Sequence, residues 1–149
     1  MQSEIDSLET KENYTVLFAC IHNSGRSVAA KVIAEHLAGD KAVILSGGSE
    51  PKDSINPLIK EALEKRGLSA DKEYPKPLTT DSVRLADVVV TMGCGETCPV
   101  FPGKRYLDWE IEDPAGKDLV TAEKVVNDIW AKVTDLLITL GITQSANEI

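Results

Sequence analysis

Apolar residues along this chain gather in short continuous runs, which alternate with stretches where they recur every three or four positions. The continuous runs predict buried strands at residues 14–20, 42–45, 86–92 and 105–109. The helical spacing predicts helices at residues 27–37, 57–66, 81–85 and 119–140. Because buried strands that alternate with helices are typical of parallel sheets covered on both faces, the sequence predicts an α/β fold.

Glycine and proline mark where several predicted elements begin and end. Pro57 opens the second helix, and Gly67 stops it. The Ser-Gly-Gly-Ser segment at residues 46–49 predicts a turn, and residues 74–77 predict irregular chain. No internal repeat or linker interrupts the pattern, so we expect one domain at residues 14–149.

Residues 1–13 differ from the rest because they are polar and acidic. We expect them to form an N-terminal extension that frays from the domain. Within it, Ile5 and Leu8 are apolar and three positions apart. The alternative is therefore a short helix that packs on a second copy of the chain, which would give a homodimer.

Composition excludes several classes of protein. The chain has 149 residues, 42% of them hydrophobic, which suits one globular domain with an adequate core. No apolar run reaches the length of a membrane span, and no signal-peptide pattern is present, so we expect a cytoplasmic protein without a membrane partner. A net charge of −8 argues against nucleic-acid binding. Three cysteines, an odd number, favour reactive or metal-binding thiols over a disulfide framework.

The segment after the first predicted strand carries the strongest chemical signal. A cysteine ends the strand, an arginine follows six positions later, and a helix begins there. Gly25 is free to adopt a positive φ in the turn. Backbone N–H groups of such a turn and of the helix N-terminus converge on one point, which predicts an oxyanion site. The residues predicted to bind the oxyanion are Ile21, His22, Asn23, Ser24, Gly25 and Arg26.

The side chains of the same segment predict nucleophilic chemistry. Arg26 can bind two oxygens of one anion with its planar guanidinium group. Cys20 would be held as a thiolate, because the field that attracts an oxyanion also stabilises a negatively charged sulfur. The Ser27 hydroxyl adds a further donor. A buried structural cysteine beside a surface arginine is the plainer alternative.

Two more cysteines, Cys94 and Cys98, follow the third predicted strand. Four positions apart, they share one face if the segment is helical, and they can form a disulfide with modest movement. If the first and third strands are neighbours, Cys94 lies near Cys20, because parallel strands are about 4.8 Å apart. A zinc site that recruits one of the two histidines, His22 or His36, is an alternative, and unreactive loop cysteines are another.

Acidic residues crowd the segment after the fourth predicted strand, and most of them are expected to be solvated. Asp113 differs because Pro114 follows it, which stiffens the chain and disfavours helix at Asp113 itself. A fixed carboxyl group near an oxyanion-bound thiolate is suited to general acid catalysis, in which it protonates a departing oxygen.

With these three segments, the sequence resembles the arsenate reductases built on the low-molecular-weight tyrosine phosphatase fold. The resemblance covers nearly the whole chain after Tyr14. It rests on residues 20–27, 93–99, 108–109 and 113–117. It implies a four-stranded parallel sheet, no cofactor or resident metal, and a relay of three thiols coupled to thioredoxin.

The resemblance also implies the roles of individual residues. Cys20 would attack arsenate held by the loop and by Arg26, and Asp113 would protonate the departing hydroxyl. Ser27 and Asn23 would support the thiolate. Phosphate and sulfate are expected to compete with arsenate for the loop.

The relay would follow from the other two thiols. Cys94 would attack Cys20, releasing arsenite and leaving a disulfide between them. Cys98 would then attack Cys94, and the new disulfide would be presented to the reductant. Some members bind potassium near the asparagine and use an acidic residue on the first helix. Lys31 stands at the matching position, and its ammonium group would replace the cation, so no potassium requirement is expected.

Three alternative functions remain open at this point. A tyrosine phosphatase of the same fold would use the loop and Asp113 through a cysteinyl phosphate. Against it, Ala115 stands where such phosphatases usually have an aromatic residue, and two cysteines would lack a role. An arsenate reductase coupled to a low-mass thiol and a glutaredoxin-like protein is the second alternative. A non-catalytic oxyanion or metal sensor is the third.

Overall fold

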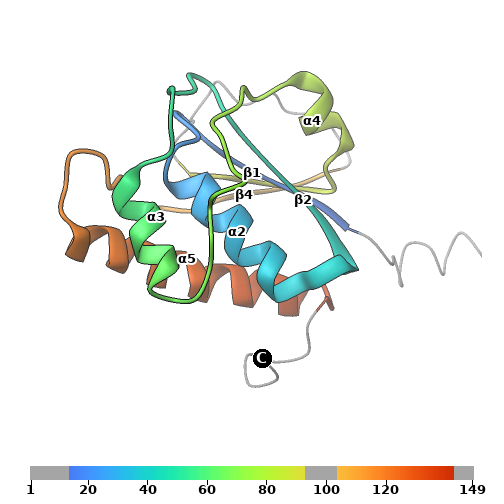
Figure 1. Cartoon of the computed structure of the whole chain (residues 1–149). Coiled ribbons are helices and arrows are strands. Elements are labelled where there is room, and N and C mark those ends of the chain that lie inside the picture. The colour runs from blue at the N-terminus through green and yellow to red at the C-terminus, as the bar shows by residue number, and fades with distance from the viewer. Residues whose placement is uncertain (1–13, 93–103, 143–149) are drawn as a thin grey trace, which may run out of the picture.

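Four parallel strands form the centre of the computed structural model, which describes residues 14–92 and 104–142 (Figure 1). The strands are β1 (Tyr14–Cys20), β2 (Ala42–Gly48), β3 (Val88–Thr91) and β4 (Arg105–Asp108). Their order in the sheet is β2-β1-β3-β4. The predicted four-stranded parallel sheet is therefore confirmed. Strand β1 lies between β2 and β3, so the first and third predicted strands are neighbours.

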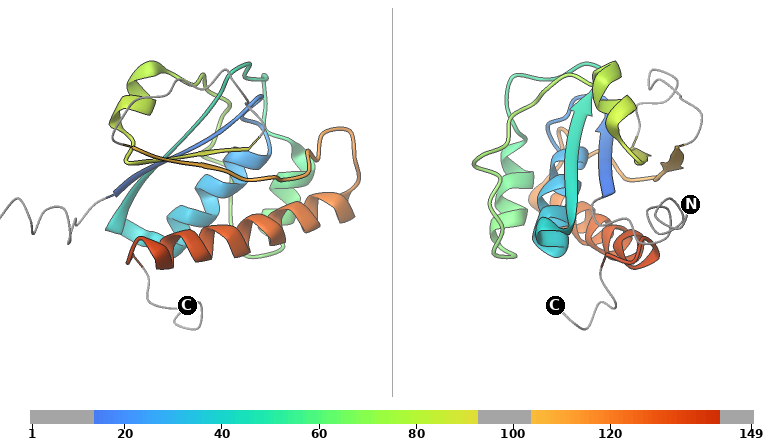
Figure 2. Two further views of the ribbon diagram at one scale, coloured as in Figure 1. Left: turned by 180° about the vertical axis from the view of Figure 1, so that it is seen from behind. Right: turned by 90° about the vertical axis from the view of Figure 1, so that its right-hand side faces the viewer.

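Helices cover both faces of this sheet, as predicted (Figure 2). The helices are α2 (Arg26–Ala38), α3 (Pro57–Glu64), α4 (Thr80–Leu85) and α5 (Leu119–Thr139), with a short 3₁₀ turn, η1 (Gly39–Lys41), after α2. Helices α2, α3 and α5 lie on one face, where α5 contacts both α2 and α3, whereas α4 lies on the other face. Among the described helices, none is long and apolar enough to cross a membrane.

The alternation of side chains along β1 explains the two layers. Val16 and Phe18 point into the larger apolar core beneath α2, α3 and α5. Leu17 and Ala19 point into a smaller core that includes Val83 of α4. These four residues in the middle of β1 are fully buried, which is why this strand appears in the sequence as a continuous apolar run.

Side-chain caps set where the helices begin. The Asn56 side chain accepts hydrogen bonds from the first N–H groups of α3, and Pro57 occupies the first helical position. Thr79 and Ser82 form a reciprocal capping box at α4. Asp118 caps α5, and hydrogen bonds from Thr121 hold the pKa of the Asp118 carboxyl below its usual value. These caps agree with the predicted helix starts to within one residue.

The turn predicted at residues 46–49 is wrong. Strand β2 instead continues to Gly48, which pairs with Cys20 at the end of β1. A Cβ atom at Gly48 would lie 2.6 Å from the carbonyl oxygen of Ile21. The glycines at the end of β2 therefore permit a close approach of two backbones and do not reverse the chain.

Gly48→Ala is expected to destabilise the protein by about 2–3 kcal/mol, because the new methyl group meets backbone atoms that cannot rotate away. Gly67→Ala is the control. Gly67 also resists substitution, since its φ is +81°, but a Cβ there meets nothing within 4 Å, and the expected cost is only about 1 kcal/mol. Denaturant unfolding of both variants measures the difference. Equal midpoints for Gly48→Ala and the wild type would contradict the crowding seen at Gly48.

Candidate active site

The loop between β1 and α2 lies at the carboxyl end of the sheet, where open α/β sheets bind their ligands. The chain that follows β2, residues 49–56, lies outside this loop and hydrogen-bonds to the carbonyl groups of the loop. Four backbone N–H groups of that segment donate to carbonyls of the loop at 2.7–3.2 Å. The donor–acceptor pairs are Ser49–Cys20, Glu50–Ile21, Lys52–His22 and Asn56–Ser24. In a trans peptide the N–H points opposite to the C=O, so the N–H groups that follow these carbonyls face the interior of the loop. Converging N–H groups of this kind make a concavity suited to an anion, as the sequence predicts for this loop.

The thiol of Cys20 lies inside this loop and is 2% exposed. Its sulfur accepts a hydrogen bond from the Asn23 backbone N–H at 3.3 Å and lies 2.9 Å from Ser27 Oγ. Asn23 Nδ2 donates to the same Ser27 oxygen at 2.7 Å. Because Ser27 Oγ accepts from Asn23, its own proton is free to point at the sulfur. The Asn23 N–H and the Ser27 hydroxyl are therefore both placed to donate to Cys20.

The backbone conformation of the loop differs from the prediction at one glycine. Gly25 has φ −135° and not a positive value, whereas Asn23 has φ +48°. Asparagine tolerates this left-handed conformation better than most residues, and it brings the Asn23 N–H to the sulfur. Glycine suits position 25 for another reason: a Cβ there would lie 3.3 Å from Cγ of Pro114, so the ring would have to shift by a few tenths of an ångström.

Arg26 and Asp113 face each other across the mouth of the loop. Arg26 Nη1 donates to the carbonyl of Ile111 at 3.2 Å, and Nη2 lies 3.7 Å from Asp113 Oδ2. The Arg26 side chain is 9% exposed, whereas that of Asp113 is 52% exposed. The other oxygen of Asp113 accepts the Ala115 N–H at 3.0 Å. The guanidinium group is therefore fixed, and the carboxyl group is held beside it with access to solvent.

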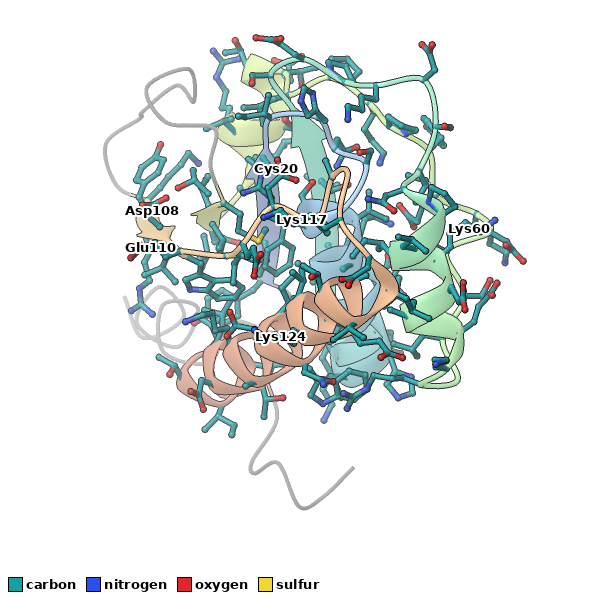
Figure 3. All side chains as sticks on the ribbon, turned by 90° about the vertical axis from the view of Figure 1, so that its left-hand side faces the viewer. Cys20, Lys60, Asp108, Glu110, Lys117 and Lys124 are labelled. Carbon is teal, nitrogen blue, oxygen red and sulfur yellow. The ribbon has the colours of Figure 1, made fainter. Side chains whose placement is uncertain are left out.

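These side chains line one small depression. Figure 3 shows Cys20 at the end of its strand and Lys117 on the chain that follows β4. The depression is lined by Cys20, His22, Ser24, Gly25, Arg26, Asn56, Asp113, Pro114 and Ala115. The loop predicted to hold an anion and the carboxyl group predicted to donate a proton are thus parts of one site.

Lysines lie behind the loop, but not in the arrangement expected from the sequence. Lys31 contacts Glu73 at 2.8 Å and Glu35 at 3.2 Å. Burial alone would lower the pKa of Lys31, but these two carboxylates outweigh it and hold that pKa above its usual value. The ammonium group that contacts Asn23 belongs to Lys76, 3.4 Å from Oδ1. The expectation that Lys31 takes the place of a cation beside Asn23 is therefore corrected.

The second and third thiols of the predicted relay, Cys94 and Cys98, lie outside the described residues. The structure does describe the strand that leads to them. Thr91 pairs with Ala19, and the Met92 N–H donates to the carbonyl of Ala19 at 2.7 Å. The chain thus leaves β3 next to the strand that ends in Cys20. Within residues 14–92 and 104–142, no three acidic, histidine or cysteine side chains cluster to hold a metal ion.

Sequence reasoning missed two residues that support the loop, Gly48 and Lys76. The signal for Gly48 was the pair of glycines at a strand end, which indicates close backbone approach as well as a turn. The signal for Lys76 was its position between two prolines, which fixes the direction of its backbone. Its N–H donates to Asn23 Oδ1 at 2.9 Å, across 53 positions in sequence.

Comparison with known proteins agrees with this geometry. The chain matches the family described as low molecular weight phosphotyrosine protein phosphatase over residues 15–146. It is 31% identical over 123 residues to arsenate reductase 1 of Staphylococcus epidermidis, a match that covers 80% of this chain and 92% of that protein.

Solved structures give the same relationship. The thioredoxin-dependent arsenate reductase of Corynebacterium glutamicum superposes with a TM-score of 0.79 at 39% identity. That match covers 92% of this chain and 66% of the other. An arsenate reductase in its phosphate-binding state superposes with a TM-score of 0.76 at 26% identity, over 85% of this chain and 98% of the other.

Proposed function

Since the chain belongs to the low molecular weight phosphotyrosine protein phosphatase family, we propose that it is an enzyme of that family which reduces arsenate to arsenite. The observation that carries this proposal is the environment of Cys20. A buried thiol accepts hydrogen bonds at the centre of an anion-binding loop, beside a fixed guanidinium group. Relatives that are named arsenate reductases cover most of the chain, which favours arsenic over phosphorus as the reacting atom.

The first step forms a bond between sulfur and arsenic. The loop N–H groups and Arg26 hold the oxygens of arsenate, and the Cys20 thiolate attacks the arsenic atom. One oxygen must leave as the new bond forms. Asp113 is placed to protonate that oxygen, so that it departs as water. The product of this step is a Cys20–arsenate adduct that still contains arsenic in its pentavalent state.

The second step transfers two electrons. A thiolate at Cys94 attacks the Cys20 sulfur and forms a disulfide. The electron pair of the sulfur–arsenic bond stays on arsenic, which leaves as trivalent arsenite. Cys98 then attacks Cys94, displaces the Cys20 thiolate, and carries the oxidation away from the loop. A dithiol reductant, for which thioredoxin is our choice, reduces the Cys94–Cys98 disulfide and completes the cycle.

Three further expectations belong to this proposal. Phosphate and sulfate compete for the loop, because both are tetrahedral oxyanions. No cofactor or metal is expected to be required, since thiols supply both electrons. No potassium requirement is expected either, because the Lys76 ammonium already contacts Asn23 Oδ1. A relay that depends on reduced thiols suits the cytoplasm, where we expect the enzyme. A homodimer formed through residues 1–13, which lie outside the described residues, stays a prediction.

A tyrosine phosphatase is the competing function. It would use Cys20, Arg26 and Asp113 in the same places, through a cysteinyl phosphate. Against it, the residue after Pro114 is Ala115, which is exposed and offers no ring to grip a phenyl group. The two further cysteines would also be idle. We expect no more than weak phosphatase activity, which arises because arsenate and phosphate are similar in shape.

One experiment separates these functions. Purified protein is supplied with thioredoxin, thioredoxin reductase and NADPH, and NADPH consumption is followed with and without arsenate. The same preparation is tested for hydrolysis of p-nitrophenyl phosphate, and a glutathione and glutaredoxin system replaces thioredoxin in a third assay. Arsenate-dependent NADPH consumption that requires thioredoxin supports the proposal. Rapid phosphate ester hydrolysis without arsenate reduction would identify a phosphatase.

Asp113→Asn is expected to slow formation of the arsenic adduct by about 10²–10³-fold, because the amide cannot protonate the departing oxygen. Glu112→Gln is the matched control, since Glu112 is the adjacent carboxylate and pairs with Lys117 outside the site. Single-turnover measurement of adduct formation tests both variants. If the two substitutions slow the step equally, the acid is misassigned.

A further inference from the structure

We propose that Lys76 is a positioning residue for Cys20, whose ammonium group orders Asn23 and Ser27 and thereby keeps a hydrogen-bond donor on the sulfur. The inference rests on the proposed role of Cys20 as the nucleophile. It adds a residue from a distant segment, the connection between α3 and α4, which runs beside α2 in Figure 1.

The ammonium group of Lys76 occupies a site built from oxygen atoms. Nζ donates to the carbonyl of Tyr74 at 3.0 Å, to Ser46 Oγ at 3.1 Å and to Asn23 Oδ1 at 3.4 Å. An ammonium group has three N–H donors, and these oxygens supply three acceptors. The side chain is only one-quarter exposed, and its Nζ also lies 4.9 Å from the centre of the Tyr74 ring.

A continuous chain of hydrogen bonds leads from this ammonium group to the reacting sulfur. Lys76 donates to Asn23 Oδ1 through both its backbone N–H and Nζ, which fixes the orientation of the amide. Asn23 Nδ2 then donates to Ser27 Oγ at 2.7 Å, and Ser27 Oγ lies 2.9 Å from Cys20 Sγ. A positive charge at one end polarises each donor toward the sulfur. The thiolate is the form of the sulfur that gains from this polarisation.

The acidic groups behind the loop bind Lys31 more closely than Lys76. Glu73 is the nearest carboxylate, and its side chain is 8% exposed. It lies 2.8 Å from the ammonium of Lys31 but 3.7 Å from that of Lys76. The two lysines and the two carboxylates, Glu73 and Glu35, balance in number, but both carboxylates lie closer to Lys31, and the charged group that contacts Asn23 is the Lys76 ammonium.

The same surroundings make this charge sensitive to pH. Burial lowers the pKa of Lys76, and the positive charge of Lys31 lowers it further, whereas Glu73 and Glu35 oppose the change. Lys76 therefore loses its proton at a lower pH than an ordinary lysine. Its effect on Cys20 should be present near neutral pH and should fade as the pH rises through that deprotonation.

Lys76→Met tests the ammonium group alone, because methionine is similar in length and keeps the backbone N–H that binds Asn23. The measurement is the rate at which iodoacetamide alkylates Cys20, followed by mass analysis of the peptide that contains Cys20. No arsenate is needed. We expect the alkylation rate at pH 7 to fall about tenfold, because one nearby positive charge is lost. We also expect the pH–rate profile of alkylation to move to higher pH. The control is Lys72→Met, since Lys72 is exposed on the same connection, and its rate should equal that of the wild type.

A second variant keeps the proposal testable if the methionine disturbs packing. Lys76→Ala leaves a space, and added methylammonium ions should restore Cys20 alkylation, whereas tetramethylammonium at the same ionic strength should not. The inference is overturned if Lys76→Met alkylates at the wild-type rate across the pH range. It is equally overturned if the loss is the same at every pH and methylammonium restores nothing. If Cys20 of the wild type reacts no faster than a cysteine in the unfolded chain, the proposed nucleophile itself is wrong.

Discussion

Cys20→Ser is expected to lower arsenate turnover by on the order of 10⁴-fold or more, while the protein remains folded. A serine hydroxyl is not ionised near neutral pH, so no nucleophile is available to bond with arsenic. It also cannot form a disulfide, so arsenite has no route of release even if an adduct forms. Both steps of the proposed reaction fail at the same atom, which is why we expect this effect to be among the largest.

The fold should tolerate this substitution, because serine is slightly smaller than cysteine and can accept the same hydrogen bond. The Asn23 N–H lies 3.3 Å from the sulfur and would have an oxygen acceptor in its place. Thermal unfolding of the variant is the control, and its midpoint should lie within a few degrees of the wild type. The measurement is arsenate-dependent NADPH consumption through thioredoxin. Retention of more than a few per cent of the activity would mean that another thiol begins the reaction.

The strand that ends in Cys20 could be predicted because the apolar character of its own residues reflects the buried environment. Residues Val16 to Ala19 are all fully buried, so the apolar run is continuous. Cys20, also buried, marks the end of the strand. The order Cys20, then Arg26, then a helix required only local geometry. Loop and helix were therefore located correctly without any knowledge of distant segments.

The glycines of β2 could not be assigned from local sequence. A glycine pair is typical of a turn, and nothing nearby in the chain indicates that Gly48 lies against the Ile21 carbonyl. The close approach arises only when β2 pairs with β1, which is a contact between segments about 28 positions apart along the chain. For the same reason, the positive φ was expected at Gly25 but lies at Asn23. Both residue types allow this backbone angle, and tertiary contacts decide which one adopts it.

The support behind the loop was the least predictable part of the site. Lys31 was chosen because it stands on the first helix where some members of the family that the sequence resembles have an acidic residue near a potassium ion. In the structure, the lysine that contacts Asn23 is Lys76, which lies on the connection between α3 and α4. Lys76 and Lys31 both form ion pairs with Glu73. Charge networks of this kind depend on three segments at once, and residue type alone does not distinguish one lysine from another.

The relay predicts the other very large effect, at Cys94 and Cys98. Cys94 must reach Cys20, because attack on that sulfur is the step that leaves an electron pair on arsenic. The described strands favour such an encounter, since β3 pairs directly with β1 and Met92 bonds to Ala19. Cys94→Ser should therefore stop the reaction before arsenite is released by this route, with steady-state turnover lower by on the order of 10³-fold or more.

Cys98 is needed only after arsenite has left, so Cys98→Ser should behave differently from Cys94→Ser. It should complete one turnover, release one equivalent of arsenite and stop with Cys20 and Cys94 joined by a disulfide. The wild type oxidised by arsenate should instead carry the Cys94–Cys98 disulfide, which thioredoxin reduces. Peptide mapping of the trapped proteins, together with arsenite quantification, measures both outcomes. If the stalled Cys98→Ser protein has Cys20 joined to a low-mass thiol and not to Cys94, the internal relay is wrong. Electrons would then enter at Cys20 from a small thiol, and a glutaredoxin-type reductant would replace thioredoxin in the proposed cycle.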